Sequence, residues 1–200
     1  MSRHLLWRVM ACFSVAIAAY ALVLLAVPSI GAPFLPDRLA TLPLALRTHL
    51  VASAVALAVG PFQFHARIRT TRPHLHRWLG RLYLLGVLAG GVSGLRLALV
   101  SEGGLVAHLG FGLLAACWLA ATALAWAAVR RRDLAGHRAW MVRSYAMTFA
   151  AVSLRLYLPL GLMAGLPFGV IYPAVSWLCW VGNLLIAERV FVAPLRRRAA

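Results

Sequence analysis

The stretch LVAHLGFGLLAACWLAATALAWAAV, residues 105–129, contains 25 residues and no charged side chain other than a titratable histidine. About 20 apolar residues in a helix are enough to cross a hydrocarbon core of about 30 Å. Inside lipid the backbone amides must bond within their own segment, which a helix achieves. We therefore expect this stretch to be a membrane-spanning helix, and the rest of the chain repeats its pattern.

Five further apolar stretches reach a similar length, so we expect an all-α, polytopic membrane protein. The six predicted transmembrane helices are residues 9–27, 48–64, 78–100, 105–129, 139–163 and 168–193. Turn-forming residues indicate breaks between them: Pro28, Pro33, Pro36 and Pro43 after the first span, Gly60-Pro61 at the end of the second, and Ser101-Glu102-Gly103-Gly104 before the fourth. No other segment is long enough to fold as a soluble domain. Residues 1–200 are therefore expected to form a single integral membrane domain in contact with the lipid bilayer.

The composition agrees with a lipid environment, because 63% of the residues are hydrophobic and only 12% are charged. Cys12, Cys117 and Cys179 stand singly in apolar runs, which excludes a CxxC pair and a CxxCH covalent haem motif. There is no HExxH or GxSxG motif, and the four acidic residues are not paired for acid–base work. These absences argue against a membrane-embedded hydrolase.

The basic residues indicate an orientation. All twenty are Arg. If the N-terminus is cytoplasmic, sixteen of them fall on that side, and the other side has only Arg38, Arg47, Arg96 and Arg155. Cytoplasmic loops carry such an excess of basic residues, so both termini are expected in the cytoplasm. This distribution accounts for the net charge of +16 without a nucleic-acid partner.

The first apolar stretch has an alternative interpretation as a cleaved signal peptide. Arg3 and Arg8 precede it, and small residues follow at 29–32. A retained first span is preferred, because an even number of spans keeps Arg3 and the arginines at 196–198 on one side.

Four of the seven histidines begin successive predicted spans, from the second to the fifth: His49, His76, His108 and His137. The other three lie in the N-terminal tail or in the first cytoplasmic loop, where contact with water or headgroups is the simpler interpretation. Ionisable side chains near lipid are costly, so each of the four is a candidate functional group.

Since neighbouring spans run in opposite directions, His49 and His108 are expected toward the outer face, and His76 and His137 toward the cytoplasm. Two histidines at matching depth on different helices are what a six-coordinate haem b needs. The chain offers two such pairs. The alternative for each histidine is an interfacial hydrogen bond to a loop or a headgroup, and the strict alternation favours ligation.

Glycines accompany two of these histidines along their helices. They are Gly80, Gly86, Gly90 and Gly94 on the span of His76, and Gly104 and Gly112 on either side of His108. Glycine beside an axial histidine lets a flat macrocycle approach the backbone. Close helix packing through small residues is an equally good explanation.

A polar stripe follows one face of the fifth predicted span. Its members at helical spacing are His137, Met141, Ser144, Thr148, Ala151 and Arg155. We expect this face to contact protein or a cofactor and not lipid. The main alternative function is a haem-free carrier that binds an anion, protons or another small molecule along this stripe. The broken helices and internal repeats typical of transporters are not recognisable in the sequence.

Four arginines are candidates to bind haem propionates, because a guanidinium matches a carboxylate. They are Arg96 and Arg155 near the outer level and Arg77 and Arg143 near the inner level. The outer two can equally reach lipid headgroups. In the sixth span, Glu188 is expected to pair with Arg143, and Asn183 to bond a neighbouring helix.

Three short motifs resemble a known family: HRWLGRLY at 76–83, HRAWMVRSY at 137–145 and WVGNL at 180–184. They are similar to a bacterial family of predicted membrane proteins catalogued as domain of unknown function 2306, over roughly residues 45 to 190. The resemblance implies a multi-pass protein of the bacterial inner membrane and supplies no activity.

A more distant resemblance is to the cytochrome b561 family, six-helix proteins whose four central helices each give one histidine to two haems b. It implies a four-helix core of spans two to five, and the same pairs, His49 with His108 and His76 with His137. The chain has no counterpart of that family's ascorbate-binding sequences.

The resulting hypothesis is transmembrane electron transfer through two haems b, each bound by two histidines. A protein with this function would be an oxidoreductase. A quinol or a small reductant is a candidate donor. The sequence leaves open the acceptor, the direction of electron flow and whether the protein is a homodimer.

Overall fold

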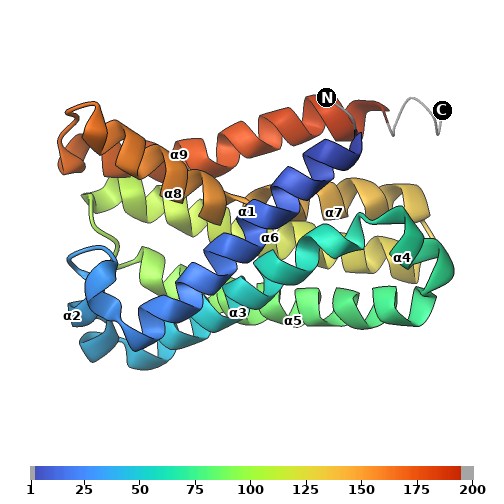
Figure 1. The fold of residues 1–200 in the computed structure, drawn as a ribbon, viewed down its shortest axis with the longest axis horizontal. Helices are drawn as coiled ribbons and strands as arrows, with labels where there is room; N and C mark the ends of the chain where they lie inside the picture. The colour runs from blue at the N-terminus through green and yellow to red at the C-terminus, as the bar shows by residue number, and fades with distance from the viewer. Residues whose placement is uncertain (1–2, 195–200) are drawn as a thin grey trace. The chain divides into compact units, whose positions relative to one another are not determined.

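The computed structural model describes residues 3–194, and no strand occurs among them (Figure 1). Six helices in this range are long and apolar enough to cross a membrane: Leu5–Ala26, Pro43–Gln63, Pro73–Ala98, Gly104–Arg130, Leu134–Met163 and Phe168–Val192. The predicted all-α, polytopic class is confirmed. Arg196, Arg197 and Arg198, which were counted on the cytoplasmic side, lie outside the described residues.

The chain divides into two compact units, Met1–Gly94 and Leu95–Ala200. The helices of the first unit are α1 (Arg3–Ala26), a 3-10 turn (Pro28–Ile30), α2 (Leu35–Thr41), α3 (Pro43–Gln63), α4 (Ala66–Thr71) and most of α5 (Pro73–Ala98). Those of the second are α6 (Gly104–Arg130), α7 (Leu134–Thr148), α8 (Ala150–Met163), α9 (Phe168–Ala187) and a π-helical turn (Glu188–Val192).

The second, third and fifth spans each begin five residues earlier than predicted. Pro43 and Pro73 are the first residues of α3 and α5, whereas we had read Pro43 as part of a break. Proline favours the first helical position, because its fixed φ suits a helix and its missing N–H would have no partner there. At the start of α7, Asp133 caps the helix by accepting a hydrogen bond of 2.8 Å from the Gly136 amide.

The fifth span is broken in its middle, where the sequence predicted one continuous helix. Helix α7 ends at Thr148 and α8 begins at Ala150, with Phe149 in a turn between them. The Phe149 amide bonds the Tyr145 carbonyl at 2.8 Å, and the Ser153 amide bonds the Phe149 carbonyl at 3.1 Å. The chain therefore passes through the turn without losing the backbone bonds on either side.

In the first unit, α1 and α5 both pack against α3. The indole of Trp7 on α1 donates to the Pro61 carbonyl at 2.9 Å and lies edge-on to Phe62. A Cβ atom added at Gly86 on α5 would lie 2.8 Å from the Ala52 carbonyl oxygen on α3. Gly86 therefore allows close helix packing, which is one of the two roles that the sequence suggested for these glycines.

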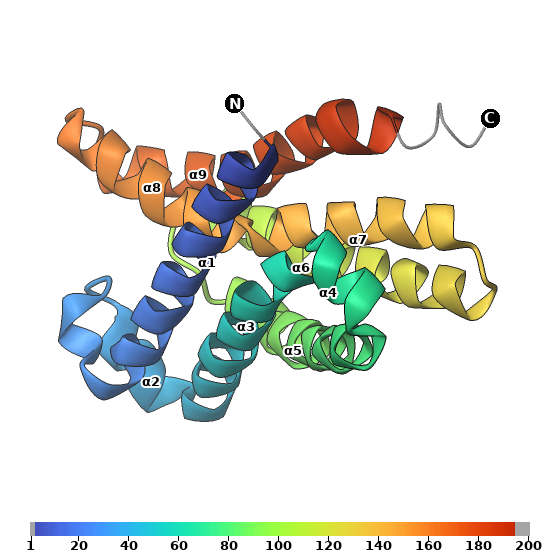
Figure 2. The ribbon, with the colours of Figure 1, turned by 45° about the vertical axis from the view of Figure 1, so that its right-hand side comes forward.

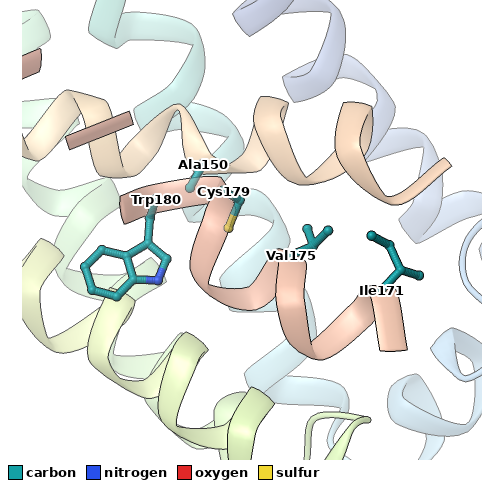
Figure 3. Packing of buried hydrophobic residues seen from close by; sticks show 5 residues of the cluster. All are labelled: Ala150, Ile171, Val175, Cys179 and Trp180. Atoms are coloured by element: carbon teal, nitrogen blue, oxygen red, sulfur yellow. The ribbon is translucent and has the colours of Figure 1, made fainter. Parts of the chain in front are cut away.

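In the second unit, α6 and α7 run side by side in both views (Figures 1 and 2). An apolar cluster joins α8 to α9, and Figure 3 shows its buried members Ala150, Ile171, Val175, Cys179 and Trp180. Gly161 on α8 lies against Ile171, so that these two helices meet closely. This apolar cluster thus holds the second half of the broken span against the sixth span.

Candidate functional site

In the first unit, a hydrogen bond fixes the ring of His49. Its Nδ1 atom lies 2.8 Å from the carbonyl oxygen of Gly90 on α5. A carbonyl can only accept, so Nδ1 must carry the hydrogen. In the neutral imidazole the lone pair is then on Nε2, the nitrogen that points away from this bond.

His137 in the second unit repeats this arrangement. Its Nδ1 atom donates to the carbonyl of Ala125 on α6 at 2.9 Å. The lone pair of the neutral ring is again on Nε2. Two histidines on different helices, one in each unit, therefore have the same tautomer for the same reason.

His108 has the opposite tautomer. Its Nε2 atom donates to the Ser101 carbonyl at 2.9 Å, across the turn that precedes α6. The lone pair is therefore on Nδ1. Binding a metal through Nε2 would require this ring to give up its bond to Ser101.

Within each unit, the two histidines lie near opposite ends of the helices. His49 bonds Gly90, which is 14 residues beyond His76 on α5, or about 21 Å of helix. His137 bonds Ala125, which is 17 residues beyond His108 on α6, or about 25 Å. Within each unit the two histidines are therefore far apart along the helices. The pairs themselves join residues of different units and stay predictions.

The hydrogen bonds of these histidines can be compared with those that haem-binding histidines usually make. A metal-bound histidine commonly donates its other ring N–H to a backbone carbonyl, which orients the ring and raises its basicity. His49 and His137 fit this pattern, and His108 fits it only after its ring turns. Residues 3–194 hold no group of three or more His, Cys, Asp or Glu that could bind a metal ion, but bis-His ligation of a haem requires only two side chains.

Among the described residues, no neighbouring helix packs closely against the glycines on either side of His108. A Cβ atom at Gly104 would meet nothing within 4 Å, and at Gly112 only the Ala98 Cβ at 3.9 Å. Gly104 also has a φ of +65°, which favours glycine at this helix start. The space beside the His108 helix is consistent with the predicted approach of a flat group.

The middle of the polar stripe contacts protein. Ser144 and Thr148 are buried, and their hydroxyls meet α6: Ser144 Oγ lies 2.6 Å from Thr122 Oγ1, and the Trp118 indole donates to Thr148 at 2.8 Å. The expectation that this part of the stripe faces protein is confirmed. Its hydroxyls join α7 to α6.

Arg143 forms the predicted ion pair with Glu188. Its Nε and Nη2 atoms donate to the two carboxylate oxygens at 3.0 and 2.8 Å, in the two-pronged geometry that suits this pair. The guanidinium also lies 4.5 Å from the ring centroid of Trp140. The ion pair thus joins α7 to the π-helical turn that follows α9.

We expect the variants Arg143→Gln and Glu188→Gln each to lower the free energy of unfolding by about 1–2 kcal/mol. The Arg143 side chain is only 13% exposed, so removal of Glu188 leaves a poorly solvated charge. The measurement is a double-mutant cycle on the protein in detergent micelles. If the two losses simply add in the double variant, the ion pair contributes nothing specific.

The other arginines proposed for propionates have local contacts. Arg155 donates to the Ala151 carbonyl one turn earlier at 3.1 Å, and Arg77 donates to His74 Nδ1 at 3.2 Å. Arg96 is exposed. The propionate role of all four arginines stays a prediction.

Asn183 bonds two segments of the fifth span. Its Nδ2 donates to the Ala146 carbonyl at 3.1 Å, and its Oδ1 accepts from Ser153 at 3.0 Å, so one amide spans the turn at Phe149. The expected contact with a neighbouring helix is confirmed. Thr122 was not predicted, although it is the one hydroxyl residue between 105 and 129, and that isolation was the available signal.

Comparison with known proteins gives one match. A family model described as a predicted membrane protein (DUF2306) matches residues 46–191. No curated protein and no solved structure matches the chain. The resemblance to cytochrome b561 therefore rests on the histidines alone.

Proposed function

The chain belongs to the DUF2306 family of predicted membrane proteins, and from the histidines of its spans we propose that it transfers electrons across the membrane through two haems b. The observation that carries the proposal is the shared tautomer of His49 and His137. In both rings a backbone carbonyl accepts from Nδ1–H, so that the lone pair of the neutral ring is on Nε2, the nitrogen that would bind the iron.

One haem would be held by His49 and His108, and the other by His76 and His137. Each pair takes one histidine from each unit. Within each unit, the two histidines are about 21–25 Å apart along the helices. By the distribution of arginine, the first pair belongs to the outer side of a bacterial inner membrane and the second to the cytoplasmic side.

The chain's own residues orient the ligands. The carbonyls of Gly90 and Ala125 fix the planes of two imidazoles and make them better electron donors, which favours the ferric state. His108 joins its pair once its ring has left the Ser101 carbonyl. A bound haem would supply reversible one-electron chemistry. The candidates to neutralise propionates are Arg96, Arg155, Arg77 and Arg143, of which Arg143 already pairs with Glu188.

The test is the visible spectrum of the full chain, purified in detergent from haem-replete cells. We expect sharp b-type bands that change on reduction with dithionite, and two haems per chain by the pyridine haemochrome assay. Electron paramagnetic resonance of the oxidised protein is expected to show low-spin ferric haem with two imidazole ligands. A folded but colourless preparation would contradict the proposal.

A further inference from the structure

A pocket lies in the segment that connects α3 to α5, and its lining ends at Leu75, the residue before His76. Its volume is about 510 Å³, within the usual range of about 300–1,000 Å³ for small-molecule sites. The residues that line it are His65, Arg67, Ile68, Thr71, Arg72 and Leu75. All of them belong to the first unit.

The lining of this pocket is suited to an anion. Two guanidiniums and an imidazole face it, and residues 64–81 contain no acidic side chain to compete for them. The Thr71 hydroxyl already donates to the Arg67 carbonyl at 2.7 Å, so the donors for a ligand are the arginines and the histidine. Guanidinium binds phosphate through paired N–H groups, which makes a phosphate the best match.

His65 adds a second, independent observation. Its Nδ1 atom is buried and has no hydrogen-bond partner within the described part of the chain. A buried polar atom without a partner is costly and calls for a ligand or water. The ring cannot easily turn away, because the Trp7 indole lies edge-on to it with 4.9 Å between the centroids.

The position of the pocket decides between a lipid and a soluble anion. Both α3 and α5 are long and apolar enough to span the membrane, so the segment between them lies at the membrane surface, whichever side that is. Ile68 and Leu75 give the pocket an apolar part beside its cationic one. Arg81 lies over the exposed ring of Trp78, 5.3 Å from its centroid, and tryptophan prefers the depth of the headgroups.

We propose that this pocket binds the headgroup phosphate of an anionic phospholipid, with Arg67 and Arg72 as its main contacts and His65 as a hydrogen-bond donor. Basic pockets at the surface ends of membrane helices bind such headgroups. The two apolar residues would contact the start of the acyl chains.

The test is native mass spectrometry of the full chain in an uncharged detergent, titrated with short-chain phosphatidylglycerol. Arg67→Gln and Arg72→Gln are each expected to weaken binding by about tenfold. Arg69→Gln is the matched control: it removes the same charge from the same helix, but Arg69 does not line the pocket. We expect it to change binding by less than about twofold, since a neutral micelle has no surface potential.

Short-chain phosphatidylcholine and inorganic phosphate complete the experiment. Both are expected to bind much more weakly than phosphatidylglycerol. Equal losses for all three arginine variants would show diffuse charge attraction and overturn the proposal. Tighter binding of inorganic phosphate than of the lipid would also overturn it, in favour of a soluble anion. Unchanged melting curves of the variants exclude loss of fold as the cause.

Discussion

Replacing His49, His108 or both with Ala is expected to leave the same amount of haem, about half of that in the unsubstituted protein. The reason is that one missing axial ligand is enough to release the haem that the pair holds. Removal of its second ligand then costs nothing further. The pair His76 and His137 is expected to behave in the same way. The measurement is the pyridine haemochrome content per chain.

The double variant His49→Ala/His137→Ala provides the contrast, because it removes one ligand from each pair and is expected to be free of haem. His74→Ala is the matched control, since His74 is exposed and bonds only Arg77 among the contacts described. If His49→Ala/His108→Ala lost all haem, the proposed pairing would be wrong, and loss of all haem in both double variants would mean that the histidines are paired within the units.

Adding one methyl group at Gly110 is expected to destabilise the protein by about 1–3 kcal/mol. Gly110 lies on α6 where α9 crosses it. A Cβ atom there would overlap the Ser176 hydroxyl and lie 2.9 Å from the Trp177 Nε1 and 3.0 Å from the Ser176 Cβ. Both residues are held by bonds of their own, Ser176 to the Pro173 carbonyl and Trp177 to the Val106 carbonyl. The neighbours therefore cannot yield without losing those bonds.

Gly112→Ala is the control for this experiment, because it makes the same change two residues along the same helix. Its new methyl group would meet only the Ala98 Cβ at 3.9 Å, an ordinary contact. Alanine is a better helix former than glycine by about 1 kcal/mol, so this variant is expected to be neutral or slightly more stable. The measurement is the unfolding curve in mixed micelles. Equal destabilisation at both positions would contradict the close approach of α9 at Gly110.

The six spans were predictable because length and apolar composition are local properties that lipid enforces. The first residues of the spans were less predictable. Pro43 is typical of a break between helices, but proline also favours the first position of a helix, and α3 begins there. The break at Phe149 was missed for a different reason. No glycine or proline marks this turn. The side chain that bonds both sides of it is the amide of Asn183, which belongs to another helix.

The candidate site also has a part that the sequence predicted and a part that it could not predict. The Arg143–Glu188 pair followed from the charge of the two residues and their place along the spans. The carbonyl partners of the rings could not be predicted, because the contacts of His49 with Gly90 and of His137 with Ala125 depend on the register of one helix against another. Every residue has a carbonyl, so the sequence carries no mark of the one that is used.

The turn at Phe149 also has a consequence for how this protein enters the membrane. Helix α7 has 15 residues and α8 has 14, so each is about 21–23 Å long, too short to cross a core of about 30 Å alone. The two halves must therefore be inserted together, with the turn at Phe149 between them. Asn183 emerges from the ribosome 34 residues after Phe149, so the amide that bonds Ala146 and Ser153 arrives only with the last span. Biogenesis of the fifth span is thus completed by the sixth.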